Sequence, residues 1–217
     1  MIMELREAIK KRRSVRRFLS QPVEEDKLMK VIEAGMWAPS ACNMQSWKFV
    51  VIDKEEIKHQ LADWGAAAFI RYAPLAIIVL YDNRTANVEY HDHIQSAAAG
   101  IENMLLTATA LGLGTCWVAQ LPAKERVRQL LKIPRVYDPV ACIVMGYPAV
   151  DPKPVDRKEF PETAVSYNEF SGKAGKQNIL KIMAKRILLK VFYWVPVRIK
   201  KKINNLVDKH FVKKFPE

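Results

Sequence analysis

The sequence has little cysteine, and its spacing suits neither a disulfide framework nor a metal. Of 217 residues only three are cysteines, Cys42, Cys116 and Cys142, an odd number without a C-x-x-C pair. A disulfide scaffold and a structural zinc site are therefore disfavoured, and we expect a reduced, cytoplasmic protein. The amino terminus is charged from residue 4 and lacks the apolar stretch of a signal peptide.

The common catalytic signatures are also missing. No G-x-G-x-x-G follows a predicted strand, and there is no Walker A loop, no H-E-x-x-H and no G-x-S-x-G. The triplet His91-Asp92-His93 could indicate a metal, but no further ligands have suitable spacing. A loop or a helix start is the favoured interpretation there. We predict neither a metal site nor a set of catalytic side chains.

Acidic residues are scarce at one end of the chain. The net charge is +12, but residues 171–217 hold 13 basic residues against two acidic ones, whereas residues 1–170 hold 22 against 21. The basic excess therefore belongs to an appendage on a nearly neutral body, and no nucleic acid is expected as partner of the whole protein. We predict a core domain over residues 1–170 and a basic C-terminal extension over residues 171–217.

Hydrophobic patterns predict helices that alternate with buried strands. Helices are expected over residues 3–13, 24–36, 54–72, 93–111 and 123–132, and strands over residues 48–52, 75–81, 116–119 and 140–146. The uncharged stretch 103–123 contains Gly112, Gly114 and Pro122. We interpret it as a buried helix, a turn and a strand rather than as a membrane span. The pattern favours a central sheet covered by helices, of class α/β or α+β.

Three blocks of sequence could contact a ligand. The arginine segment, residues 12–16 (RRSVR), offers guanidinium groups and a hydroxyl that suit a phosphate, although a solvated basic face is the simpler alternative. The tryptophan turn, residues 37–47 (WAPSACNMQSW), suits a heteroaromatic ring, or else caps a helix beside core tryptophans. The glycine junction, residues 110–117 (ALGLGTCW), allows close approach of a ligand or ends a helix.

In order and spacing, RRSxRxF, WAPSxxNxQxW, ALGLGTCW and a final MGYP resemble the FMN-dependent nitroreductase family from about residue 4 to Tyr167. The resemblance implies an α+β fold: a nitroreductase-like α/β/α sandwich whose mostly antiparallel central sheet is flanked by helices. It implies a homodimer with FMN at the interface and NADH or NADPH as electron donor. The acceptor would be an electron-poor small molecule such as a nitroaromatic or a quinone. Because the flavin would do the redox chemistry, no catalytic side chain is expected.

The resemblance also assigns residues to the FMN site. The phosphate and ribitol would be held by Arg12, Arg13, Ser14 and Arg16, with Arg157, or Lys158 as its substitute, completing the phosphate site. From the other subunit, the flavin would be approached by Pro39, Ser40 and Ala41. The polar pair of the family motif is matched by Asn43 and Gln45, and the ring system would lie against Leu113 and Gly114.

The sequence departs from the family pattern at three places near this site, one of which is Ser46, where a proline usually precedes the second tryptophan. Cys42 stands where glycine is usual, and we interpret it as a small apolar filler rather than as a reactive thiol. Residues 65–68 (GAAA) stand where many relatives carry an amide that contacts the flavin. One contact to the ring is therefore in question.

The extension is predicted to contain two basic amphipathic helices, over residues 178–195 and 199–211, separated at Pro196. Three interpretations stay open: the tail wraps the dimer partner, lies on an anionic membrane surface, or binds an acidic protein or nucleic acid. Membrane contact would place the protein peripherally at the inner membrane face. In the alternative function, the body is a flavin-fold scaffold and the tail binds an anionic membrane surface or an acidic partner.

Overall fold

The described part of the chain forms two compact units. The computed structural model describes residues 3–84, 87, 89–153, 155, 164–171, 179–196 and 199. The first unit contains the described residues up to Pro152 and Ile199, and the second is Lys153–Pro196. The predicted division of the chain at residue 170 stays a prediction.

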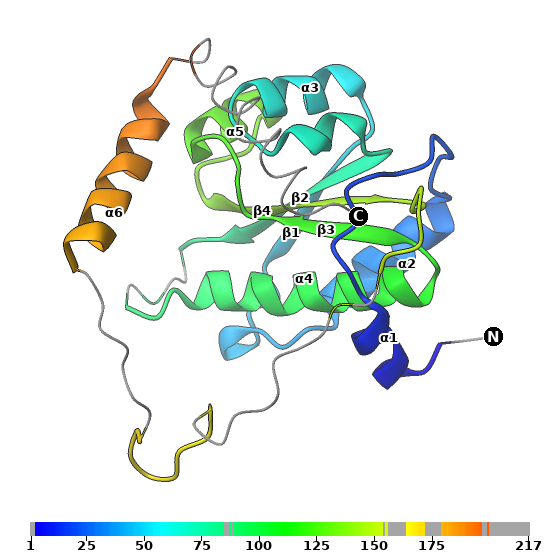
Figure 1. Cartoon of the computed structure of the whole chain (residues 1–217), viewed down its shortest axis with the longest axis horizontal. Helices are drawn as coiled ribbons and strands as arrows, with labels where there is room; N and C mark the ends of the chain where they lie inside the picture. Colours follow the sequence, from blue (N-terminus) through cyan, green and yellow to red (C-terminus); the bar gives the residue numbers. More distant parts are fainter. Residues whose placement is uncertain are drawn as a thin grey trace. The chain divides into compact units, whose positions relative to one another are not determined.

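A four-stranded sheet forms the centre of the first unit (Figure 1). Its strands lie in the order β1 (Trp47–Ile52), β2 (Leu75–Asp82), β4 (Tyr137–Gly146) and β3 (Gly114–Val118). Each of the three strand pairs is antiparallel. All four predicted strands are confirmed, and the direction of pairing, which the hydrophobic pattern left open, is the antiparallel one.

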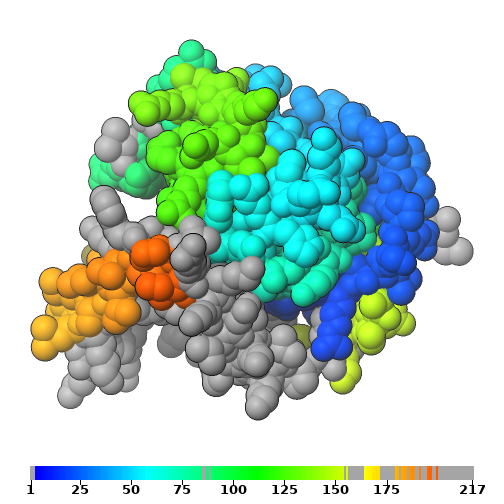
Figure 2. All heavy atoms as spheres, turned by 90° about the horizontal axis from the view of Figure 1, so that it is seen from above, coloured from blue at the N-terminus to red at the C-terminus, as the bar shows by residue number. Residues whose placement is uncertain are grey.

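Helices cover both faces of the sheet, which explains the continuous apolar runs in β2 and β4. On one face α2 (Glu25–Met36) and α4 (Asp92–Ala110) pack against alternate strand residues such as Ile77 and Ile143. On the other face α3 (Glu55–Asp63), the 3-10 turn η2 (Ala68–Tyr72) and α5 (Lys124–Leu131) pack against Ile78 and Val144. Figure 2 looks onto this second layer. The expected α+β sandwich is therefore confirmed.

The predicted helix over residues 54–72 is wrong beyond Asp63. α3 ends there, and Gly65 turns the chain with a φ of 115°, a value that glycine adopts without strain. The chain resumes as η2 after this turn. Buried Lys58 ties α3 to the start of β2, because its ammonium group donates to the carbonyls of Ala73 at 2.6 Å and Pro74 at 3.1 Å.

α2 and α4 approach each other through glycines. A Cβ added to Gly35 would lie 2.8 Å from the side chain of Met104, and one added to Gly100 would lie 2.9 Å from the indole nitrogen of Trp47. The indole N–H of Trp47 donates to the carbonyl of Ser96 on α4 at 3.0 Å. The close helix packing therefore fixes the point at which the tryptophan turn enters β1.

A charged cluster joins four elements at the Tyr81 end of the sheet. Asp138 accepts hydrogen bonds from Lys124, from Arg128 at 2.5 Å and from Asn83 at 2.9 Å, and lies 3.7 Å from His93 at the start of α4. Burial by itself raises the pKa of Asp138. The hydrogen bonds from Lys124 and Asn83 and the charges of Lys124 and Arg128 outweigh burial and hold the pKa below its usual value.

The second unit contains α6 (Ile179–Trp194), which confirms the first helix predicted in the extension. The second, predicted over residues 199–211, lies almost entirely outside the described residues. Within the described part of the chain, no helix has the length and apolar character that crossing a membrane requires.

We predict that Asp138→Asn lowers the free energy of unfolding at pH 7 by about 3 kcal/mol, because Arg128 and Lys124 lose their shared counter-charge. Since folding lowers the pKa of Asp138, its stabilising contribution is present above the unfolded pKa and is lost as pH falls through the folded pKa. Urea unfolding of both proteins should give a constant difference from neutral pH down to roughly pH 5 and a shrinking one below about pH 4. A difference that persists at the lowest pH would contradict this assignment.

Candidate functional site

The arginine segment lies beside the first residues of β3. The backbone N–H of Val15 donates to the carbonyl of Thr115 at 2.8 Å, and Ser14 and Thr115 form an isolated parallel bridge. Gly114 allows this approach, because a Cβ there would lie 2.8–2.9 Å from the side chain of Val15. The structure thus brings the arginine segment and the glycine junction together, as two sides of one corner of the sheet.

The glycine junction both ends a helix and allows a close approach, the two roles expected of it. Gly112 ends α4 with a φ of 76°, and the N–H of Leu113 donates to the carbonyl of Ala108 at 2.8 Å, as in a helix C-cap. Gly114 serves close approach, but the group that approaches it is Val15 of the same chain. The Leu113 side chain is buried in the core beside α4.

Arg13 and Arg12 each have partners within the chain. The guanidinium of Arg13 donates to the carbonyls of Lys10 and Arg12, both at 2.8 Å, at the C-terminal end of α1 (Leu5–Lys11). These carbonyls have no intrahelical donor, so Arg13 stabilises the helix end. Arg12 lies 3.7 Å from the carboxylate of Glu102 on α4, which partly neutralises its charge.

Arg16 has a different environment. Among the described residues no carboxylate lies within ion-pair distance of it. One of its terminal nitrogens donates to the carbonyl of Ser14 at 3.3 Å, and its guanidinium carbon lies over the ring of Phe69, 5.7 Å from the ring centre. Phe69 belongs to η2, so the second helix layer and the arginine segment meet at this corner.

Positive charge lies beside the start of β3. Burial raises the pKa of the Cys116 thiol, while the charge of Arg16, the Ser14 hydroxyl and the charge of Arg12 act in the opposite direction. The Thr115 hydroxyl and the Nε of Arg13 are buried without a partner among the described residues. Buried polar groups of this kind cost free energy unless a ligand or water binds them. The corner therefore has positive charge that would attract a phosphate, with Arg16 and Arg12 as its cations.

The tryptophan turn is a tight loop fixed on α4. Within it the short 3-10 turn η1 spans Ala41–Asn43. The N–H of Ala41 donates to the hydroxyl of Ser96 at 3.1 Å, and the N–H of Gln45 donates to the hydroxyl of Ser40 at 3.0 Å. The Gln45 amide also donates to the Asn43 side chain at 2.9 Å. The polar side chains of the turn thus order one another, and Pro39 precedes them at the exposed surface.

The backbone of the turn at Cys42 favours glycine, the residue that the resemblance gives as usual there. Cys42 has a φ of 50° and Asn43 a φ of 54°, in the left-handed region that glycine and asparagine tolerate best. The Cys42 thiol is exposed, so it does not fill a core position within the chain.

The tryptophan turn and the arginine segment lie at opposite corners of the sheet. The turn leads into Trp47, which pairs with Tyr81 and through it with Asp138, at the β1 edge. The arginine segment lies beside Thr115, which pairs with Met145, at the β3 edge. Seven residues of β4 and three strand spacings separate the two corners, a diagonal of roughly 25 Å. The two blocks of one chain are too far apart to form a single compact ligand site.

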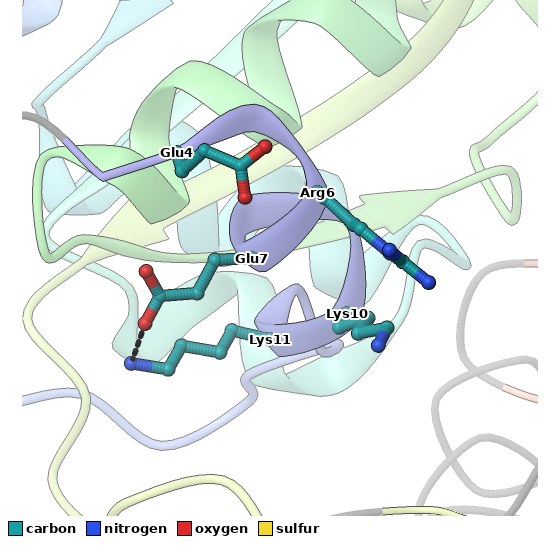
Figure 3. Close-up of a pocket in the computed structure, with 5 residues that line it drawn as sticks. All are labelled: Glu4, Arg6, Glu7, Lys10 and Lys11. Atoms are coloured by element: carbon teal, nitrogen blue, oxygen red, sulfur yellow. Dashed lines mark ion pairs between the residues drawn. The ribbon is translucent and has the colours of Figure 1, made fainter.

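The surface beside α1 is hollowed but does not enclose a ligand. The hollow is lined by Glu4, Arg6, Glu7, Lys10 and Lys11, all from α1 and the residue before it (Figure 3). An ion pair of 2.6 Å joins Glu7 and Lys11. The apolar Leu5 and Ile9 of the same helix are mostly exposed. This helix is therefore a surface that could be covered rather than a pocket wall.

Comparison with known proteins identifies the family that has this arrangement. The model of the nitroreductase family matches residues 9–71 and 59–147, which include the arginine segment, the tryptophan turn, the glycine junction and the whole sheet. The chain belongs to the nitroreductase family. The suspected resemblance is thereby confirmed.

Individual nitroreductase relatives agree with the family match. A protein of Methanothermobacter thermautotrophicus, provisionally named NADH dehydrogenase/NAD(P)H nitroreductase, is 34% identical over 154 residues, which are 69% of this chain and 80% of the relative. The structure of an FMN-dependent nitroreductase from Clostridium difficile is 30% identical, covers 75% of this chain and 98% of its own, and has a TM-score of 0.67. A provisionally named nitroreductase from Desulfovibrio desulfuricans, solved in complex with FMN, is 29% identical, with coverages of 74% and 94% and a TM-score of 0.61.

Some residues at the two corners of this nitroreductase were not singled out from the sequence. Ser96 and Phe69 were missed, and Thr115 was named only as part of the glycine junction, although Ser96 gives a signal as a polar residue on the buried face of an alanine-rich helix. Phe69 gave no signal in the sequence, because the segment that contains it was predicted to be a regular helix. The predicted phosphate residues Arg157 and Lys158 lie outside the described residues. The assignment of individual side chains to FMN stays a prediction.

The close approach at Gly114 gives a testable contrast with Gly112. We expect Gly114→Ala to lower the free energy of unfolding by about 2 kcal/mol, because the new methyl group overlaps Val15. It should also speed hydrogen exchange of the Val15 amide, which is bonded to Thr115. Gly112→Ala is the matched control, since a Cβ there meets nothing within 4 Å and should cost only about 1 kcal/mol through its left-handed backbone. Equal exchange at Val15 in both variants would argue against this packing.

Proposed function

We propose that this nitroreductase family member is an FMN-dependent oxidoreductase that takes electrons from NADH or NADPH. The observation that carries the proposal is the cationic corner, where the arginine segment meets β3 with unpaired donors. The names of the relatives support it, since they specify NAD(P)H for one and FMN for two others. When bound, FMN supplies the hydride and electron transfer.

In this proposal the arginines have different roles in the phosphate site. Arg16 and Arg12 supply charge-assisted hydrogen bonds to phosphate oxygens, and Ser14 adds a neutral donor. Arg13 mainly holds the end of α1 in place through its two carbonyl contacts and keeps Nε for the ligand. Leu113 and Gly114 set the backbone of the junction that faces the ring system.

We further propose a homodimer in which the tryptophan turn of one chain completes the site of the other. The diagonal separation of the two corners within one chain supports this. Pro39, Ser40 and Ala41 would then approach the flavin from the partner subunit, with Asn43 and Gln45 beside them. Exposed apolar side chains in the turn and just before it, such as Trp37 at 80% and Met36 at 56%, are typical of a surface that another chain covers.

The acceptor in this scheme is an electron-poor small molecule such as a nitroaromatic or a quinone. It would bind in the place that the nicotinamide leaves. The chain contributes flat apolar surface and the paired amides of Asn43 and Gln45, which orient polar edges of a ligand and exclude water. No side chain has to act as a nucleophile.

The purified full-length protein should be yellow and release FMN on denaturation. Arg16→Gln should raise the FMN dissociation constant about 10- to 100-fold, which corresponds to losing roughly 1.5–3 kcal/mol of charge-assisted bonding. Arg6→Gln is the control, because it removes the same charge from an exposed position of α1. FMN binding is followed by quenching of flavin fluorescence. A colourless protein that FMN cannot reconstitute would refute the proposal.

For the extension we propose a second role, docking on an anionic membrane surface. The apolar side chains Ile179, Met183, Ile187 and Val191 recur every fourth residue of α6, and each is more than half exposed. The surrounding extension carries 13 basic residues against two acidic ones, whereas the body is nearly neutral. A second copy of the body offers no matching excess of negative charge, and anionic lipid does.

Vesicle co-sedimentation tests this role on the full-length protein. We expect it to sediment with vesicles of phosphatidylcholine and phosphatidylserine and not with phosphatidylcholine alone. Ile187→Glu should weaken sedimentation severalfold, because a charge on the apolar face must leave the bilayer interface. Unchanged sedimentation, together with dissociation of the homodimer in the variant, would favour wrapping of the dimer partner instead.

A further inference from the structure

Arg16 is oriented by an aromatic ring rather than by a carboxylate. Its guanidinium lies over the face of Phe69 at 5.7 Å, within the range of a cation–π contact. The neighbouring Arg12, by contrast, faces the carboxylate of Glu102. The two arginines of one segment are therefore restrained in chemically different ways.

A carboxylate partner and an aromatic ring leave an arginine with different abilities to bind an anion. A carboxylate partner occupies guanidinium N–H groups and cancels the positive charge. An aromatic face attracts the cation while leaving the N–H groups in the guanidinium plane free for other acceptors. For Arg16 the structure records one such donation, the 3.3 Å bond to the carbonyl of Ser14. Among the described residues, most of its donors and all of its charge thus stay available.

Phe69 is itself held firmly. It lies in η2 beside Ile70, which is fully buried, and its half-buried ring packs against the core cluster on this face of the sheet. The N–H of Ile70 donates to the carbonyl of Ala67 at 3.1 Å, which closes the turn behind Gly65. The ring is a fixed support under a long side chain that would otherwise sample many rotamers.

We infer that Phe69 is a positioning residue for the FMN phosphate: its ring holds the Arg16 guanidinium in place with its charge uncancelled. The inference rests on the proposed function, since it names a support of the same site. Phe69 directly follows residues 65–68, the segment whose expected contact to the flavin ring is in question, and in this inference it acts on the phosphate arginine instead.

The inference is tested by a double-mutant cycle on the full-length holoprotein, with FMN release followed by flavin fluorescence. Phe69→Leu should raise the FMN dissociation constant about two- to fivefold, the range expected for an exposed cation–π contact. In the Arg16→Gln background the same change should have no further effect. Phe69→Tyr keeps the aromatic face and should restore the wild-type constant. Phe49→Leu, at a half-buried phenylalanine of β1, is the matched control for loss of ring volume.

The outcomes separate this inference from the proposed function. A wild-type protein that does not bind FMN refutes both. FMN binding that is unchanged in Phe69→Leu overturns the positioning role and leaves the proposed function intact. An equal loss of affinity with and without Arg16 also overturns it, because Phe69 would then act through the packing of η2 or by touching the flavin.

Discussion

The candidate site depends on one close approach, that of Val15 to the backbone of Gly114. Because Gly114 has no side chain, the arginine segment can pair with Thr115 and lie along the edge of β3. The backbone contact between Val15 and Thr115 places the arginines of the segment beside β3. A methyl group at Gly114 would push the segment away, and the positive groups would then lie on a chain free to move.

Given that anchor, the partners of each arginine decide what it can do. Arg13 donates to carbonyls at the end of α1, and the charge of Arg12 is partly neutralised by Glu102. Arg16 rests on Phe69 and keeps its charge. Three arginines that look equivalent in the sequence therefore differ in role. Arg13 is structural, Arg12 shares its charge with a carboxylate, and Arg16 keeps its charge for a ligand. The difference in role follows from the different partner of each arginine: carbonyls at the end of α1, a carboxylate on α4 and an aromatic ring of η2.

The same sheet that orders these groups also separates them from the tryptophan turn. Close packing of α2 and α4 at Gly35 and Gly100 fixes the turn at the β1 corner, on the far diagonal from β3. In the proposed site, which uses both blocks, the two blocks come from different chains. The exposed Trp37 and the uncovered face of α1 are consistent with surfaces that a second copy would cover.

The sequence by itself determined the elements and the family. Strand and helix periodicity depends on local burial, so all four strands and most helices could be predicted, and the spacing of the three blocks identified the nitroreductase family. The break at Gly65 was missed because a left-handed glycine leaves no trace in hydrophobic periodicity. The family resemblance implied a mostly antiparallel sheet, but only the tertiary structure decided that Gly114 accommodates Val15 and that Arg16 lies on Phe69. These contacts join residues distant in the chain, and a linear pattern carries no information on which side chains meet.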